Sequence, residues 1–317
     1  MFLAYFISVL LFYNYGLPIL GRPGGLVGLP EWELRHRLES RALLPDPDCP
    51  CCVVTASSSG QELYGYVSEE ELPWFAESPA RLTQLKEELG TRHLVTAFRT
   101  VLPEPLFGEE ENIAVAASYV AGTVLLPGKT ASLNHIIGPY TQERGYREGP
   151  TYIGTHIVGT VAGGVCKIAS TLYNVIIASD LQVIERHPHS MLVPYVPPGR
   201  DATVAWGAKD FRFRNNRDSP VVFWALSLEG SLYIAMYGRF VPPVIEWHHK
   251  ELRRLPAWTI KRATPELPKG TTRFIEGYDA VTVRTWITIT YPNQPSKRRD
   301  LGTDHYRAMP HIIEFGS

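Results

Sequence analysis

The spacing of the apolar residues changes in the middle of the chain, and this change constrains the fold more than any other feature. After Cys166, the side chains of Ile168, Leu172, Val175 and Ile176 recur at the spacing of one helix face. Short runs rich in β-branched and aromatic residues follow, separated by Pro-Gly, Asn-Asn and Glu-Gly pairs. Such runs predict an antiparallel meander. The expected fold class is therefore α+β, a mixed domain in which the helix follows a Gly-Gly-Val-Cys turn.

Further elements and five segments follow from the remaining pattern. The predicted strands of the meander are SMLVPYVP, ATVAW, DFRFRN, PVVFWALSL and SLYIAMYG, and RHLVTAFRTVL and VTVRTWITITYPN are two more. Helices are expected in SEEELPWFAESPARLTQLKEEL, where Ser68 and Glu71 are spaced as in a capping box, and in NIAVAASYVAG. The predicted segments are an anchor or signal at 1–21, a linker with short helices at 22–88, the mixed domain at 89–240, a proline-rich linker at 241–263 and a small all-β module at 264–317.

Length and charge exclude one class of partner. The 317 residues, 44% of them hydrophobic, are enough to bury a core and predict about two domains. The chain carries 31 Lys and Arg against 32 Asp and Glu, without a basic stripe interleaved with aromatic residues. A polyanionic partner has no electrostatic support, so nucleic-acid binding is not expected.

The first 21 residues carry no charged side chain and are mostly apolar. They predict an export signal or an uncleaved membrane anchor, with the rest of the chain facing the extracytoplasmic side or secreted to the cell wall. Arg22, Arg35 and Arg37 follow this segment and no positive residue precedes it, contrary to the positive-inside tendency. A buried N-terminal helix of a cytosolic protein is the alternative.

Three of the four cysteines, Cys49, Cys51 and Cys52, form a CPCC run in the first linker. No nearby His or Cys supplies a fourth zinc ligand, so a local disulfide or an unimportant thiol group is expected there. The chain also has no G-x-S-x-G, Walker or H-E-x-x-H motif. We expect neither a metal nor a cofactor.

Cys166 follows the pair Gly163-Gly164 at the start of the predicted helix. The unpaired N–H groups and the dipole of a helix N-terminus stabilise a thiolate. Glycines let the backbone approach a ligand closely, and their N–H groups are suited to bind the oxyanion of an acyl transfer. A buried, inert cysteine fits the same sequence equally well, so the spacing alone does not decide between the two.

A nucleophilic cysteine usually needs a histidine as its base. His189 is the first candidate, because it follows the predicted helix and leads into a predicted strand. His187 is its local rival, and His156 and His135 are alternative bases. Asp201 is suited to orient a histidine or to cap the next turn.

Three further residues are candidates for substrate contact. Arg186 is suited to pair with a substrate carboxylate, with a solvated surface arginine as the alternative. Tyr173 and Asn174 lie within two turns of the cysteine, where core packing is the alternative to substrate contact.

Four linked runs resemble the VanW-like domain in order and spacing, over about residues 90–240. They are ENIAVAASYVAGTVLLPGKTASLNHIIGP, GGVCKIASTLYN, ERHPHSMLVPYVPPGRDATV and DFRFRNN. The tail, from LPKGTTRFIEGYDAVTVRTWITITYPN to MPHIIEFG, resembles a G5 module, which accompanies that domain on bacterial cell-surface proteins. Ala280 departs from the G5 pattern, where a second glycine is usual.

The resemblance implies roles for several residues, because some VanW-like proteins are regarded as cysteine-dependent L,D-transpeptidases of peptidoglycan. Cys166 corresponds to the family's cysteine, Gly163 and Gly164 to its glycines, His189-Ser190 to its His-Ser pair and Asp201 to the Asp of its G-x-D-A-T motif. Ser190 thereby joins the candidate oxyanion or substrate-binding residues. Lys167, Ala169 and Leu133 depart from the family pattern, which bears on substrate preference and activity.

The expected function is thus an exported enzyme of the cell envelope. Cys166 attacks a peptidoglycan stem peptide, His189 transfers the proton, and an amine or water resolves the acyl-enzyme. The alternative is a non-catalytic peptidoglycan-binding or glycopeptide-resistance accessory protein.

Overall fold

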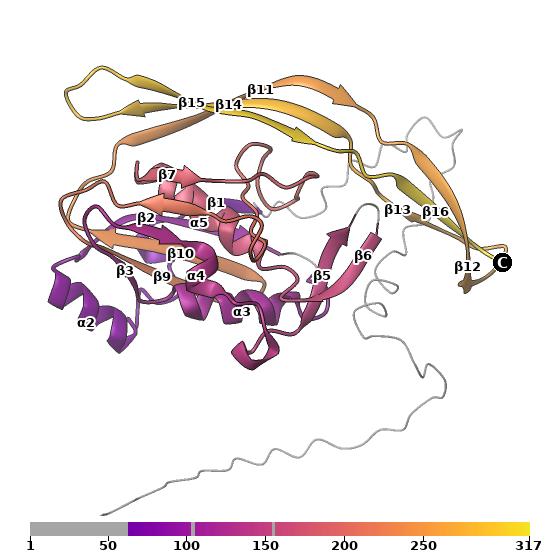
Figure 1. Cartoon of the computed structure of the whole chain (residues 1–317), viewed down its shortest axis with the longest axis horizontal. Coiled ribbons are helices and arrows are strands. Elements are labelled where there is room, and N and C mark those ends of the chain that lie inside the picture. Colours follow the sequence, from indigo (N-terminus) through magenta and orange to yellow (C-terminus); the bar gives the residue numbers. More distant parts are fainter. Residues whose placement is uncertain (1–62, 103–104, 154–155) are drawn as a thin grey trace, which may run out of the picture.

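The computed structural model describes residues 63–102, 105–153 and 156–317, and Figure 1 shows their arrangement. The predicted anchor at 1–21 and the CPCC run lie outside these residues. Helices and antiparallel strands both occur in the described part, so the chain is of the α+β class. No helix in these ranges is both long enough and apolar enough to cross a membrane.

A five-stranded antiparallel sheet lies at the centre of the mixed domain. Its order is β1 (Tyr64–Tyr66), β2 (His93–Val101), β10 (Ser231–Gly238), β9 (Val221–Leu228) and β3 (Thr123–Leu125). Within this sheet, β9 and β10 form a hairpin at Glu229-Gly230, whose positive φ angles suit a tight hairpin turn. β10 also pairs with β2, from the other end of the domain. The predicted meander is therefore wrong, because strands distant in sequence close this sheet.

Helices cover both faces of the central sheet, as alternation along its strands requires. On one face pack α5 (Cys166–Ala178) and α3 (Glu109–Val120), and on the other α2 (Ala80–Leu89), which follows the 3₁₀ turn η1 (Glu69–Glu71). In β2, Phe98 faces α5 whereas Ala97 faces α2. The helices predicted after Cys166 and around NIAVAASYVAG are confirmed, but α5 is buried on all sides.

Short elements fill most of the chain between β3 and α5. They are β4 (Thr130–Ser132), α4 (Leu133–Ile137), η2 (Gln142–Arg144), β5 (Glu148–Ile153) and β6 (His156–Val161). β4 joins a second sheet in the order β4-β8-β7, with β8 (Arg212–Arg214) and β7 (Gln182–Glu185). Elements of three to six residues are too short for a hydrophobic period to show in the sequence.

The strands predicted in SMLVPYVP and ATVAW are wrong. The chain from 186 to 211 forms turns and extended loop, with a single isolated bridge between Ala205 and Lys209. Pro194, Pro197 and Pro198 lack the N–H group that a strand ladder needs. This loop carries the predicted site residues Arg186, His189, Ser190 and Asp201.

The C-terminal region forms two three-stranded sheets. One contains β11 (Val244–Leu255), β14 (Ala280–Thr290) and β15 (Lys297–Tyr306), and the other β12 (Thr259–Lys269), β16 (His311–Gly316) and β13 (Thr272–Ile275). β14 alternates buried and partly buried residues, as its sequence pattern predicted. The linker predicted at 241–263 is wrong, because β11 lies there and its prolines fall only at its ends, where no ladder bond is lost.

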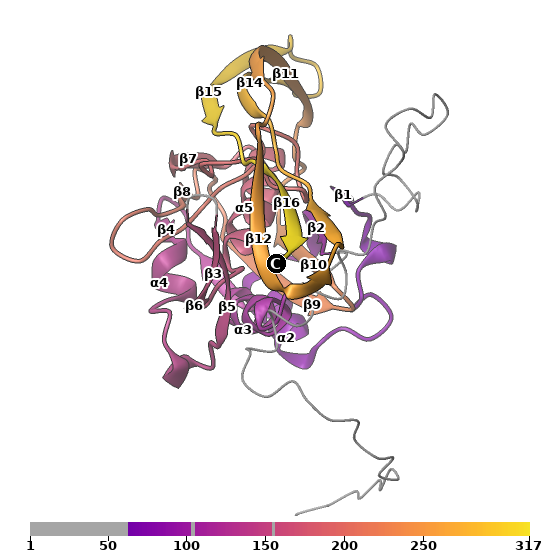
Figure 2. The same cartoon turned by 90° about the vertical axis from the view of Figure 1, so that its right-hand side faces the viewer.

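The sheet β11-β14-β15 lies over α5 and β7, as Figures 1 and 2 show from two directions. Ile287 and Ile289 of β14 join the main core. The rings of Trp247 in β11 and Tyr173 in α5 pack in a T-shaped arrangement, with 6.0 Å between their centres. The sheet β11-β14-β15 therefore packs directly against the mixed domain.

Candidate active site

The turn before α5 is built from glycines for steric reasons. A Cβ at Gly163 would lie 2.1 Å from the carbonyl oxygen of Gly149 in β5, so the two backbones approach closely only without a side chain. Gly164 adopts a φ of +95°, and a Cβ there would meet Glu109. This turn places Cys166 as the first residue of α5.

The Cys166 thiol is half-buried among polar groups. Its Sγ lies 3.1 Å from the Thr203 hydroxyl and 3.5 Å from the Val204 carbonyl oxygen. Burial raises the pKa of the thiol, but the hydrogen bond and charge of His189, followed by the contacts with Thr203 and Val204, outweigh burial and lower it. The surroundings therefore favour a thiolate beside an imidazolium.

His189 is held by Asp201. The imidazole Nδ1 lies 2.6 Å from Oδ2 of Asp201, and the backbone N–H of His189 donates to the same oxygen at 2.7 Å. Burial lowers the pKa of His189, but hydrogen bonds with Asp201 and Cys166 raise it to about 9. Burial also raises the pKa of Asp201, yet hydrogen bonding and charge from His189, with the charge of Arg186, lower it to about 2.

The second oxygen of Asp201 has two other partners. Oδ1 accepts from Arg186 Nη2 at 3.0 Å and from the hydroxyl of Tyr306 in β15 at 2.5 Å. Arg186 also donates through Nε to the Asp201 backbone oxygen, and through Nη1 to both oxygens of Asp304 at 2.7 and 2.6 Å. The carboxylate is 1% exposed and fully hydrogen-bonded, as a buried charge must be.

Two backbone N–H groups at the turn are open for an oxyanion. Gly163 donates to Thr160 O at 3.0 Å and Val165 to Ala162 O at 3.3 Å. In the described part of the chain, the N–H groups of Gly164 and Cys166 have no backbone acceptor. Gly163 therefore serves the close packing of the turn against β5. Of the two glycines predicted to bind an oxyanion, Gly164 is the one whose N–H has no backbone acceptor among the described residues.

Several other predicted residues lie away from the thiol. Asn174 is buried and bonds to Ser170 O and to Arg200, and Tyr173 is buried in the main core. Arg186 is used by two carboxylates, which differs from the expected open cation. Ser190 is exposed, and its carbonyl oxygen accepts from Arg307 N–H at 2.7 Å.

The alternative histidines also occupy other places. His135 is exposed, and its ring meets the edge of Trp206 at 6.3 Å. His187 bonds to Glu185 at 3.0 Å. His156 begins β6, and its side chain lies outside the described part. In the described part, His189 is the histidine whose side chain reaches the thiol.

Several residues near the thiol are not among the predicted site residues. The rings of Tyr195 and His189 form a T-shaped pair with 6.5 Å between their centres. Lys167 Nζ lies 5.3 Å from the centre of the Tyr195 ring. Tyr140 meets Trp206 at 6.2 Å, and its pKa is raised by burial and by the charge of Cys166. These residues come from four separate stretches of the chain, so only the tertiary structure brings them together.

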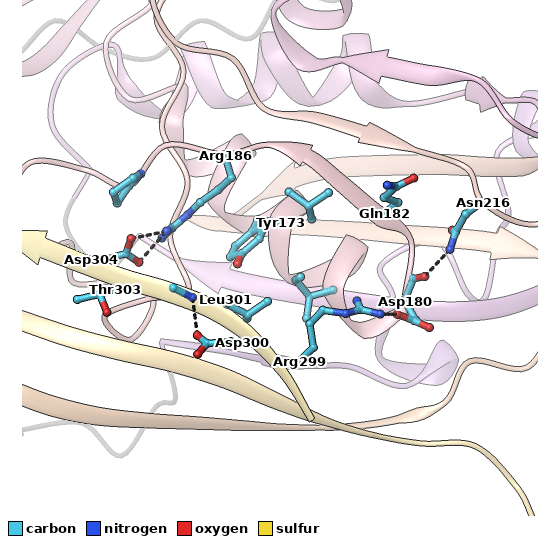
Figure 3. Close-up of a pocket in the computed structure, with 14 residues that line it drawn as sticks. Tyr173, Asp180, Gln182, Arg186, Asn216, Arg299, Asp300, Leu301, Thr303 and Asp304 are labelled. Atoms are coloured by element: carbon cyan, nitrogen blue, oxygen red, sulfur yellow. Dashed lines mark hydrogen bonds and ion pairs between the residues drawn. The ribbon is translucent and has the colours of Figure 1, made fainter. Parts of the chain in front are cut away.

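A polar cleft of about 600 Å³ lies beside this site, between α5, β7 and β15. Figure 3 shows Arg186 directed at Asp304 and Arg299 directed at Asp180 across it. Cys166 does not line this cleft. Within the described residues, no group of three His, Cys, Asp or Glu side chains is arranged to hold a metal ion.

Comparison with known proteins finds a family model that matches part of this chain. Residues 108–237 match the family model described as VanW like protein, which confirms the predicted VanW-like domain. The chain is 36% identical over 158 residues to the uncharacterized protein YoaR of Bacillus subtilis (strain 168), covering 50% of this chain and 48% of that protein. It is 26% identical over 119 residues to the vancomycin B-type resistance protein VanW of Enterococcus faecalis (strain ATCC 700802 / V583), covering 36% and 43%.

The chain thus spans about half the length of the curated relatives it matches. Among solved structures, the G5 domain of IgA1 protease is 20% identical, with a TM-score of 0.16, over 25% of this chain and 98% of that one. The HP0197 G5 domain is 17% identical, with a TM-score of 0.13, over 23% and 97%.

Proposed function

We propose that the VanW-like domain at residues 108–237 acts in the cell envelope as a cysteine-dependent acyl transferase on peptidoglycan stem peptides, of the L,D-transpeptidase type. The observation that carries this proposal is the arrangement of Cys166, His189 and Asp201. A thiol, a histidine and a buried carboxylate in that order are the parts of a nucleophile, its base and the group that orients the base.

The first half of the proposed reaction forms a thioester. The Cys166 thiolate attacks the carbonyl carbon of the scissile peptide bond, and the carbonyl oxygen becomes an oxyanion. The unpaired N–H groups of Gly164 and Cys166 at the α5 N-terminus bind this charge. The His189 imidazolium then gives its proton to the leaving amine, the C–N bond breaks, and the acyl group stays on sulfur.

The second half regenerates the enzyme. Neutral His189 removes a proton from an incoming amine or from water, which attacks the thioester carbonyl. The C–S bond breaks, the new amide or acid leaves, and the thiolate and imidazolium are restored. Asp201 stays ionised throughout, because the charges of His189 and Arg186 hold its pKa at about 2.

The envelope location rests on two supports. Residues 1–21 predict an export signal or membrane anchor, and the Enterococcus faecalis relative is named as a vancomycin B-type resistance protein. Peptidoglycan lies outside the cytoplasmic membrane, so an exported domain would meet its substrate there. Membrane attachment through the first segment belongs to the proposal.

The test is an intact-mass measurement on the full chain incubated with a tetrapeptide muropeptide. We expect a covalent adduct at Cys166, lost in Cys166→Ala. The matched control replaces Cys49, Cys51 and Cys52 with Ala and leaves Cys166 in place, and it should keep the adduct. If the wild-type chain gains no mass and releases no cross-linked or hydrolysed product, acyl transfer on this substrate is wrong.

A non-catalytic peptidoglycan-binding protein is the second candidate. The contacts of Cys166 Sγ with Thr203 and Val204 favour it in one respect, because the same contacts would hold an inert thiol. This candidate expects Cys166→Ala to bind sacculi as wild type does, with a thiol that reacts slowly with iodoacetamide near neutral pH. Rapid alkylation of Cys166 by iodoacetamide, together with a covalent adduct from the muropeptide, would support the enzyme over the binding protein.

A further inference from the structure

Strand β15 of the C-terminal sheet reaches into the candidate active site. Asp304 and Tyr306 are two residues apart, so their side chains point to the same face of β15. Asp304 bonds to Arg186 through both of its oxygens, and the Tyr306 hydroxyl donates to Asp201. One side chain of this strand therefore contacts the Asp201 carboxylate directly, and the other contacts Arg186, which is itself bonded to that carboxylate.

The same strand end also holds the loop that carries Asp201. The Tyr306 hydroxyl accepts from the Gly199 N–H at 2.7 Å, and the Arg307 N–H donates to Ser190 O at 2.7 Å. Gly199 adopts a φ of +86°, and a Cβ there would lie 2.0 Å from the Thr285 hydroxyl of β14. The loop thus approaches the sheet as closely as its backbone allows.

Burial makes these contacts matter for the histidine. Tyr306 is 3% exposed, and Arg186 and Asp304 are largely covered. Charges shielded from water interact more strongly than exposed ones. The charged and titratable groups around His189 are Cys166, Asp201 and Arg186 from the mixed domain, Tyr195 from the same loop, and Asp304 and Tyr306 from β15.

We propose that Asp304 and Tyr306 are positioning residues of the candidate active site, which act on His189 through Arg186 and Asp201, so that the C-terminal sheet completes the catalytic arrangement. This inference rests on the proposed function. Strand β15 would then do more than join the C-terminal sheet to the mixed domain, because without it Asp201 and Arg186 would each lose a hydrogen-bond partner.

A second contact between the same sheet and the mixed domain provides a matched control. The Tyr291 hydroxyl, just after β14, donates to Oδ2 of Asp180 at 2.6 Å, and Arg299 donates to Oδ1 at 2.6 Å. This is again a tyrosine bonded to a largely buried aspartate, but among the described residues Asp180 forms no hydrogen bond or ion pair with His189, Asp201 or Arg186. Tyr291→Phe removes a docking contact of the same kind without touching the candidate site.

The two positioning residues should act in opposite directions. Asp304→Asn removes a negative charge near Arg186, which lowers the pKa of both the Cys166 thiol and the His189 imidazole. Tyr306→Phe removes a proton donor from Asp201, so the carboxylate presents more negative charge to His189 and both pKa values rise. A simple loosening of the sheet would instead move both variants the same way, towards an ordinary thiol.

The experiment measures the rate of iodoacetamide alkylation of Cys166 against pH, by mass spectrometry of its peptide, in the folded full chain. We expect the midpoint to fall by about half a pH unit in Asp304→Asn and to rise by about as much in Tyr306→Phe, with Tyr291→Phe at the wild-type value. Equal midpoints in all four proteins, or shifts of the same sign in both variants, overturn the inference. Alkylation needs no peptidoglycan, so failure here and failure of the proposed reaction are distinguishable.

Discussion

Nδ1 of His189 and Oδ2 of Asp201 lie 2.6 Å apart, on a loop that bends back on itself within twelve residues. The same carboxylate oxygen accepts the backbone N–H of His189, so both the ring and the main chain of the histidine are fixed by one group. This double contact defines the orientation of the imidazole towards Cys166 and leads to the first prediction.

Asp201→Asn should slow thioester formation by roughly a hundredfold or more, because an amide cannot stabilise the imidazolium by charge and leaves Arg186 with Asp304 as its one carboxylate partner. Single-turnover mass spectrometry of the adduct measures this rate. Asp300→Asn, which changes an exposed aspartate paired with Arg284, is the control and should keep the wild-type rate. An Asp201→Asn protein as fast as wild type would remove Asp201 from the mechanism.

The pH profile of kcat/KM should have an alkaline limb near 9. Hydrogen bonds with Asp201 and Cys166 overcome burial and raise the pKa of His189 to about 9, so the imidazolium persists below this pH. As the pH rises through that value the proton is lost, and the leaving amine is no longer protonated. The measurement is turnover of muropeptide against pH, and a limb near the ordinary histidine pKa of about 6.5 would contradict the prediction.

Trp206→Ala should raise KM several-fold with a smaller effect on kcat. Trp206 is 50% exposed, meets Tyr140 and His135 edge-on, and follows Val204, which contacts the Cys166 thiol. An exposed aromatic ring beside a nucleophile is suited to hold substrate by stacking and burial. Phe75→Ala removes a 53% exposed ring next to the α2 side of the sheet and should leave KM unchanged.

Lys167→Met should stabilise the fold at neutral pH by about 4 kcal/mol. Lys167 is 1% exposed, and its Nζ has no hydrogen-bond partner among the described residues. Burial, opposed by the charges of Glu109 and Glu110, lowers its pKa from 10.5 to about 7. Folding therefore opposes protonation, and this cost grows as the pH falls from 10.5 towards 7.

Urea unfolding at several pH values measures this gain, which should shrink as the pH rises towards 10.5. Lys250→Met, at an exposed site in β11, is the control and should show no such pH dependence. A gain that is independent of pH would mean that the lysine is destabilising for another reason, such as packing.

Part of the fold was predictable because it depends on local pattern. The spacing in α5 and the alternation in β14 each identify an element by its own period, and the hairpin between β9 and β10 has its turn in Glu229-Gly230. The predicted meander failed because the partner of a strand is not written in its period. The linker predicted at 241–263 is wrong because Pro242, Pro243 and Pro256 flank β11 and do not interrupt it.

The sequence by itself determined that Cys166 stands at the start of a helix, directly after a glycine-containing turn. Two glycines, a helix start and a downstream His and Asp are local features, and they suffice to name Cys166, His189 and Asp201 as candidates. Only the tertiary structure decided that Asp201 is buried between Arg186 and Tyr306, that Arg186 is taken by two carboxylates, and that β15 supplies Asp304. Those facts depend on packing between segments more than a hundred residues apart, and the electrostatic effect of a charge depends on its burial, which no local spacing specifies.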